Sequence, residues 1–157
     1  ARLLHLSLPG SAMVTGELFD EAALHGLLYA AGRRPVLLYP EMPGERSLGM
    51  ATPPAFDAAS MGEPSRLRLV VLDGTWRKSR KMLYLNPLLQ TLPRLPLAQV
   101  PGSLYRIRKA HAPDQLSTLE ASCYALMQLE GNPGKFAPIL TGFEAFVDQY
   151  ATAAAHA

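Results

Sequence analysis

Residues 67–76, Leu-Arg-Leu-Val-Val-Leu-Asp-Gly-Thr-Trp, contain the clearest strand of the chain and the turn that follows it. The mostly apolar, branched run Leu67–Leu72 predicts a buried strand. Asp73 and Gly74 predict a tight turn, after which Thr75–Leu85 has the composition of a helix. In open α/β sheets, ligands bind at the carboxyl ends of the strands. This turn is therefore the first place in the sequence where a functional site is expected.

Strand and helix patterns alternate over the rest of the chain. Further strands are expected over Leu3–Leu8, Pro35–Tyr39 and Leu104–Arg108, and further helices over Asp20–Ala31, Ser117–Glu130 and Phe136–Ala155. Pro43–Pro64 predicts a long loop with one weak helical turn, and Pro87–Pro101 predicts alternating short helical and extended pieces. The alternation and the length of 157 residues predict a single α/β domain over residues 1–157, with a mostly parallel sheet flanked by helices.

The charge of the chain is concentrated in one block. The formal net charge is only +2, but residues 66–109 hold ten basic residues and one acid, Asp73, which gives the block a net charge of +9. The remaining residues therefore sum to −7. A basic block of this size in a nearly neutral protein predicts that a polyanion binds to one face.

Composition excludes several classes of protein. Hydrophobic residues make up 48% of the chain and charged residues 18%, so the chain is not disordered. The single cysteine, Cys123, excludes an intrachain disulfide and a cysteine-rich zinc site, and its place on an apolar helix face predicts a core residue. The four histidines lack the spacing of metal ligands, and no apolar run is long enough to cross a membrane. We expect a cytoplasmic protein that binds no metal and no membrane.

Two groups of basic residues are candidates for contacts with phosphate groups. The first lies on the helix that follows the turn, and the second on and just after the strand expected over Leu104–Arg108. They comprise Arg77, Lys78, Arg80 and Lys81, and Arg106, Arg108 and Lys109. A solvated basic face is the alternative for the first group, but basic residues on two elements favour nucleic-acid binding. Trp76, at the start of the helix, either packs in the core or stacks on a ring of the ligand.

Three polar residues have both a structural and a functional interpretation. Asp73 either caps the next helix, as Thr75 also could, or serves as a general base or a cofactor anchor. Ser117 and Glu120 have the spacing of a capping box, and Gly131 lies where such a helix commonly ends. The alternative is that hydroxyl and free N–H groups at this helix start hold a carboxylate.

Several spaced motifs resemble those of one known family. In chain order they are Thr15-Gly16, Leu37-Leu38-Tyr39-Pro40, Leu72-Asp73-Gly74-Thr75-Trp76, Ser79-Arg80-Lys81-Met82, Asn86-Pro87-Leu88-Leu89 with Leu92-Pro93, Tyr105-Arg106-Ile107-Arg108 and Thr118-Leu119-Glu120-Ala121. Over roughly residues 3–150 the sequence resembles the DTW-domain family, which is named for its Asp-x-Thr-Trp motif. Several motifs in the same order are far more specific than any one of them.

The resemblance implies both a fold and an activity. Members of the family are related to the SPOUT class, in which S-adenosylmethionine binds in the loops of a C-terminal trefoil knot. They transfer the 3-amino-3-carboxypropyl group of this cofactor to N3 of a uridine in tRNA and release 5′-methylthioadenosine. The implied fold is thus SPOUT-like, the implied cofactor is S-adenosylmethionine, and the implied partner is tRNA.

The resemblance also assigns roles to the residues singled out above. The implied cofactor pocket comprises Tyr39, Pro40, Leu72, Gly74, Thr75, Leu116, Ser117, Thr118 and Glu120. Asp73 is the implied base or positioning group for the uridine N3 proton, and Trp76 would stack on the base or pack beneath the pocket. The basic residues of the two groups would hold tRNA phosphates.

Two departures from the family pattern bear on function. Many members carry a cysteine-rich, zinc-binding segment before this region, and none is expected in this chain. Thr15-Gly16-Glu17 stands where the family tends to have Thr-Gly-Arg, which reverses a charge near the implied site and bears on the identity of the substrate. A SPOUT-type RNA methyltransferase and a non-catalytic RNA-binding domain are the two alternative functions. A monomer or a weak homodimer is expected.

Overall fold

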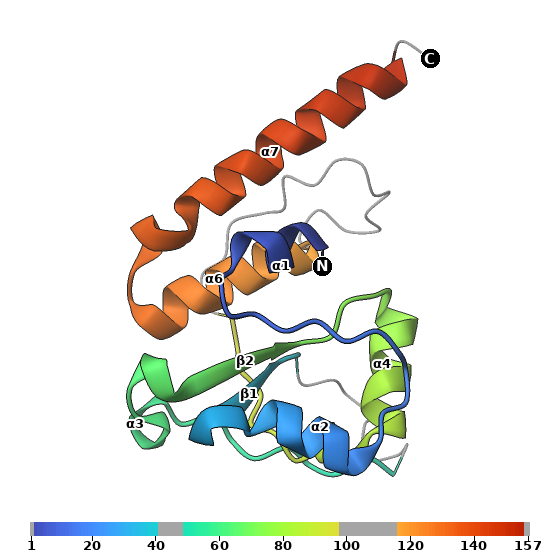
Figure 1. Ribbon diagram of the computed structural model, residues 1–157, viewed down its shortest axis with the longest axis vertical. Helices are drawn as coiled ribbons and strands as arrows, with labels where there is room; N and C mark the ends of the chain where they lie inside the picture. The colour runs from blue at the N-terminus through green and yellow to red at the C-terminus, as the bar shows by residue number, and fades with distance from the viewer. Residues whose placement is uncertain (1, 41–48, 98–115, 156–157) are drawn as a thin grey trace. The chain divides into compact units, whose positions relative to one another are not determined.

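The structure, a computed structural model, describes residues 2–40, 49–97 and 116–155, without the side chains of residues 60 and 150–155 (Figure 1). Two compact units make up the chain. Unit 1 consists of Ala1–Met13 and Leu97–Ala157, and unit 2 consists of Val14–Pro96. Helices and a parallel sheet confirm the expected α/β class. The strand expected over Leu104–Arg108 lies outside the described residues.

The sheet of unit 2 is built from β1 (Arg34–Leu38) and β2 (Leu67–Val71), which pair in parallel with Leu37 opposite Val70. The Leu37 N–H donates to Pro93 O at 2.9 Å, and Leu37 O accepts from Leu95 N at 2.9 Å. These bonds place residues 93–95 as a third extended segment on the other side of β1, in parallel orientation. Because β1 has neighbours on both sides, its residues 35–37 are all buried, as the continuous apolar run predicted.

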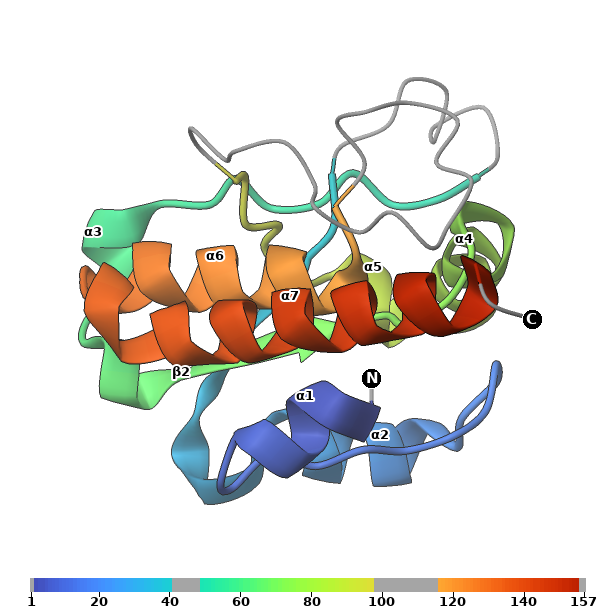
Figure 2. The same cartoon turned by 90° about the horizontal axis from the view of Figure 1, so that it is seen from above.

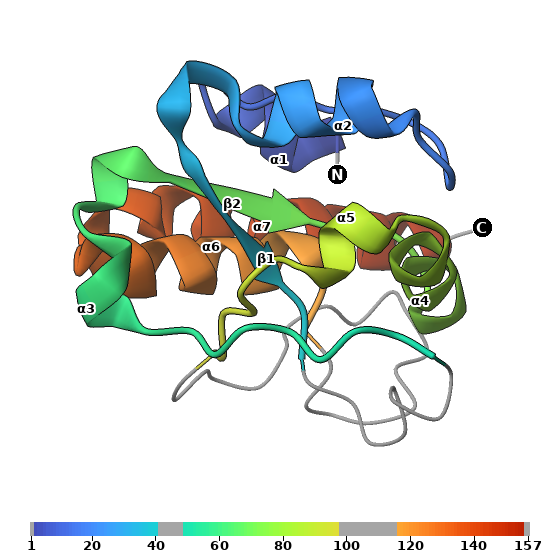
Figure 3. The same ribbon diagram turned by 90° about the horizontal axis from the view of Figure 1, so that it is seen from below.

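Several helices accompany the sheet in unit 2. They are α2 (Glu21–Leu28), a 3₁₀ turn (Ala30–Gly32), α3 (Ala58–Met61), a second 3₁₀ turn (Pro64–Arg66), α4 (Trp76–Leu85) and α5 (Pro87–Gln90). Leu24 and Leu28 of α2 pack with Leu37 of β1 and Leu83 of α4 in one buried cluster. Figure 3 shows α4 beyond the arrowhead of β2, so the start of α4 lies at the carboxyl end of the strand.

Helix α2 is shorter than the expected helix Asp20–Ala31. Its cap is as predicted, since the Asp20 carboxylate accepts from Ala23 N at 2.9 Å. The helix ends at Leu28, however, and Ala31 has a left-handed backbone with φ of 58°. A left-handed residue cannot continue a right-handed helix, so the chain turns through a 3₁₀ segment into β1.

The described part of unit 1 is helical and contains α1 (Arg2–Ser7), α6 (Thr118–Glu130) and α7 (Pro133–Ala155). Helices α6 and α7 pack against each other (Figure 2). Their core contains Leu119, Cys123, Phe136, Phe143 and Val147. Gly131 ends α6 in the left-handed conformation, with φ of 61°, as the sequence predicted.

The strand expected over Leu3–Leu8 is wrong, because residues 2–7 form helix α1. The segment is rich in leucine, which favours a helix, and contains no β-branched residue. Leu4 and Leu8, which are four residues apart, pack against the core of unit 1, whereas Leu6 is exposed. This spacing is helical, and the short run could not be distinguished from a strand by its hydrophobicity alone.

Candidate functional site

Parallel strands β1 and β2 end at the same edge of the sheet, and the turn of residues 72–76 lies there. Tyr39 and Pro40 follow β1, and Leu72 and Asp73 follow β2. The Tyr39 side chain is buried in the core of unit 2, and Leu72 packs against the same core. Both side chains therefore belong to the core beneath this edge.

The turn that leads into α4 is held by a helix cap at Thr75 and by the close approach of Gly74 to the first turn of the helix. Thr75 is the cap of α4, because its Oγ1 accepts from Lys78 N at 3.3 Å. The cap interpretation of Asp73 is thus not needed, and Asp73 is exposed at the strand end. Gly74 has φ of 159°, and a Cβ at this position would lie 3.2 Å from Lys78 Cβ. A side chain would therefore push the turn away from the first turn of α4.

Trp76 is the first residue of α4 and is not a core residue. Its side chain is 48% exposed, and its ring meets the buried Tyr39 ring edge-on, with centroids 5.9 Å apart and an interplanar angle of 73°. The Tyr39 ring thus supports one side of the indole, and about half of the tryptophan is exposed. Of the two interpretations of Trp76, stacking on a ligand is the one that this geometry permits.

Arg94 is a residue of this edge that the sequence did not single out. It is only 4% exposed, its Nη1 donates to Pro40 O at 3.2 Å, and its guanidinium carbon lies 5.4 Å from the centroid of the Tyr39 ring. The arginine therefore holds the end of β1 and the ring on which Trp76 rests. Its place in a proline-rich segment, 54 residues from Pro40, left no local signal of this role.

Helix α4 presents a cationic face. Its buried residues are Ser79, Met82 and Leu83, which lie on one side. The exposed residues include four cations and no acid, and they are Arg77, Lys78, Arg80 and Lys81. Tyr84 is also exposed. Trp76, Arg80 and Tyr84 follow one another at intervals of four residues, so they lie along the same side of the helix. Exposed aromatic rings between cations suit an unpaired nucleic-acid strand.

The family model of the DTW domain matches residues 1–151. The chain belongs to the DTW-domain family. No solved structure matches the chain. DTW domains are associated with tRNA-modifying transferases, so membership fits a role in tRNA modification or another RNA-related function. The motif that names the family lies at the strand-end edge described above, at the start of the cationic helix.

The second group of expected pocket residues lies in unit 1 of the DTW domain and forms a helix cap. Glu120 Oε2 accepts from Ser117 N at 2.8 Å, and Ser117 Oγ accepts from Glu120 N at 3.2 Å. The capping box is therefore confirmed, and Glu120 is buried. Leu116 and Thr118 are half-buried beside it. That this group shares a pocket with the strand-end residues stays a prediction.

Cys123 of the DTW domain is a core residue, as expected. It is fully buried on α6, and burial, together with the charge of Glu120, raises the pKa of its thiol to about 11. Such a thiol is not a nucleophile at neutral pH.

Among the described residues, no group of three histidine, cysteine or acidic side chains could hold a metal ion. Arg106, Arg108 and Lys109, the second expected group of phosphate contacts, lie outside the described residues. No helix in the described part of the chain is long and apolar enough to span a membrane.

Proposed function

We propose that this DTW domain transfers the 3-amino-3-carboxypropyl group of S-adenosylmethionine to N3 of a uridine in tRNA and releases 5′-methylthioadenosine. One observation carries the proposal: the family motif lies at the carboxyl end of a parallel strand, where it joins a half-exposed tryptophan to a helix with four exposed cations. A carboxylate, an aromatic ring and phosphate-binding cations thus follow one another within nine residues of the chain.

The chemistry of the strand-end residues fits the cofactor. The supported ring of Trp76 offers a flat face to an aromatic base at this edge. The segments after β1 and β2 would lie against the adenine, because Tyr39 and Leu72 pack their side chains into the core beneath this edge. At the start of α6, by contrast, the Glu120 carboxylate already occupies the helix N-terminus, which weakens the expectation that a second carboxylate binds there.

The residues of the chain have three tasks in the reaction. When bound, S-adenosylmethionine supplies an electrophilic carbon next to its sulfonium. Asp73 orients the N3–H of the uridine and accepts its proton as the new N–C bond forms and the C–S bond breaks. Trp76 holds the uracil ring in line, and positioning of this kind contributes roughly 7–11 kcal/mol to barrier lowering. The cations of α4 bind the phosphates on either side of the uridine.

The target uridine must be unpaired when it reacts. N3 of uridine takes part in base pairing in a duplex, so the base has to lie in a single-stranded loop or be flipped out of its stack. The exposed rings of Trp76 and Tyr84 suit such bases. We therefore propose a tRNA loop as the substrate of this DTW domain.

Substitution of Asp73 tests the proposal. We expect Asp73→Ala to abolish transfer from radiolabelled S-adenosylmethionine to tRNA, while circular dichroism shows that the variant is still folded. Asp73→Asn keeps the shape but removes the base, and a loss of about 10²–10⁴-fold in rate would assign proton transfer to the carboxylate. Asp148→Asn, an exposed change on α7, is the matched control. Full activity of Asp73→Ala would refute the assignment, and a methylated product would favour the methyltransferase alternative.

A further inference from the structure

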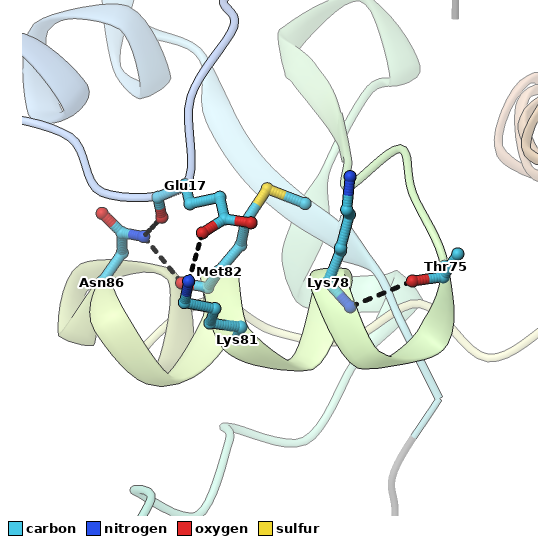
Figure 4. Close-up of polar contacts among 6 residues, drawn as sticks. All are labelled: Glu17, Thr75, Lys78, Lys81, Met82 and Asn86. Carbon is cyan, nitrogen blue, oxygen red and sulfur yellow. Dashed lines mark hydrogen bonds and ion pairs between the residues drawn. The ribbon is translucent and has the colours of Figure 1, made fainter.

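The segment of residues 14–20 is held against the C-terminal half of α4 by one buried side chain, Asn86 (Figure 4). Asn86 is 3% exposed. Its Nδ2 donates to Glu17 O at 2.8 Å and to Met82 O at 2.6 Å, and its Oδ1 accepts from Phe19 N at 3.0 Å. The amide orientation is fixed by these partners, because a flipped amide would point its oxygen at two carbonyl groups. The backbone of residues 17–19 is thereby fixed on the helix.

This arrangement places an acid on the cationic face of α4. Glu17 Oε2 lies 2.5 Å from Lys81 Nζ (Figure 4). The hydrogen bond from Lys81 lowers the pKa of Glu17, the Lys81 charge lowers it further, and the charge of Lys78 also contributes. The carboxylate is therefore ionised at neutral pH. One of the four exposed cations of α4 is neutralised within the protein itself.

The ion pair between Glu17 and Lys81 adds little to the free energy of folding. The Lys81 and Glu17 side chains are 58% and 40% exposed, and exposed pairs of this kind contribute little to folding. Asn86 holds the segment in place by a hydrogen bond to the backbone carbonyl of Glu17, and this bond does not involve the Glu17 side chain. Glu17 can thus be changed without releasing the segment. What the carboxylate does change is the charge that α4 presents to an anion.

We propose that Glu17, by its ion pair with Lys81, keeps this cation from an RNA phosphate, so that the acidic side chain limits how many phosphates α4 neutralises. The inference rests on the RNA binding of the proposed function. A carboxylate and a phosphate are both oxyanions that accept charge-assisted hydrogen bonds from the same ammonium group, so they compete for it. Glu17 then sets the affinity for RNA, and Arg77, Lys78 and Arg80 supply the remaining contacts of this helix.

The salt dependence of RNA binding tests the proposal. The probe is a short oligouridylate, titrated into the full chain without cofactor at several salt concentrations. Each neutralised phosphate of a single strand adds about −0.7 to the slope of log K against log salt concentration. We expect Glu17→Gln to make the slope steeper by about 0.7, which corresponds to about fivefold tighter binding near 0.1 M salt. In the Lys81→Gln background the same change should leave the slope unaltered.

The matched control is Glu130→Gln. Glu130 forms an ion pair with Lys135 at 2.5 Å in unit 1, so this variant removes the same charge and the same kind of pair in the unit that does not contain α4. Equal slopes for Glu17→Gln and Glu130→Gln would overturn the inference, and so would a steeper slope for Glu17→Gln in the Lys81→Gln background. A wild-type protein that does not bind the oligouridylate would overturn the RNA-binding part of the proposed function instead.

Discussion

Replacement of Asn86 tests how the segment before α2 is attached to α4. Asn86→Ala removes three side-chain hydrogen bonds at a buried site, to Glu17 O, Met82 O and Phe19 N. At about 0.5–1.5 kcal/mol each, these bonds sum to roughly 1.5–4.5 kcal/mol. For a chain of this size, such a loss lowers the unfolding midpoint by roughly 3–18 °C. We expect a loss of this size when unfolding by urea or heat is followed by fluorescence.

The fluorescence signal is specific to this part of the protein. Trp76 is the single tryptophan, and it begins the helix that Asn86 ends. Asn86→Asp tests the two donated hydrogen bonds more specifically. The aspartate has the same size and still accepts from Phe19 N, but a carboxylate oxygen replaces the amide nitrogen that faces the two carbonyl groups. We expect it to cost at least as much as Asn86→Ala.

The matched control for Asn86→Ala is Asn132→Ala. Asn132 is exposed, and its Oδ1 accepts a single bond, from Lys135 N at 3.3 Å. The same substitution there should cost no more than about 1 kcal/mol. An Asn86→Ala variant as stable as the wild type, or no less stable than Asn132→Ala, would refute the reasoning that the buried amide holds the segment in place.

Three further predictions concern single residues. Gly74→Ala should lower the unfolding midpoint, because its Cβ would lie 3.2 Å from Lys78 Cβ at a φ of 159°, and an unchanged midpoint would contradict the close packing of the turn. Ser117→Ala should cost about 1 kcal/mol in urea unfolding followed by circular dichroism, and a neutral change would show that the cap does not stabilise α6. Cys123, with a thiol pKa of about 11, should be only about one thousandth ionised at pH 8 and should react with iodoacetamide slowly until urea unfolds the chain. Equal rates with and without urea would contradict its burial.

Features that depend on neighbouring residues could be predicted from the sequence. The capping box of Ser117 and Glu120 and the left-handed Gly131 are where the pattern placed them. Thr75 was one of two candidate caps, and only the geometry assigned the cap to it. Strands β1 and β2 were also predictable from their apolar runs. Only β1, which has neighbours on both sides, is buried as such a run predicts, whereas β2 is half-buried after Leu67.

Features that depend on distant residues could not be predicted. The bonds from Asn86 join residues 67 and 69 positions apart in the sequence, and the Arg94 bond to Pro40 spans 54 positions. No local pattern reports such pairs. The strand predicted over Leu3–Leu8 was wrong for a related reason. Tertiary packing decides which leucines of this segment contact the core of unit 1. The exposure of Trp76 likewise required the structure.

The most direct test of the central claim is mass spectrometry of tRNA nucleosides after incubation with the protein and S-adenosylmethionine. We predict that the wild-type protein adds the mass of a 3-amino-3-carboxypropyl group to a uridine, and that Asp73→Ala does not. The release of 5′-methylthioadenosine should accompany the product in equal amount. A uridine that gains only a methyl group, or tRNA that is unchanged by a protein that binds it, would contradict the claim.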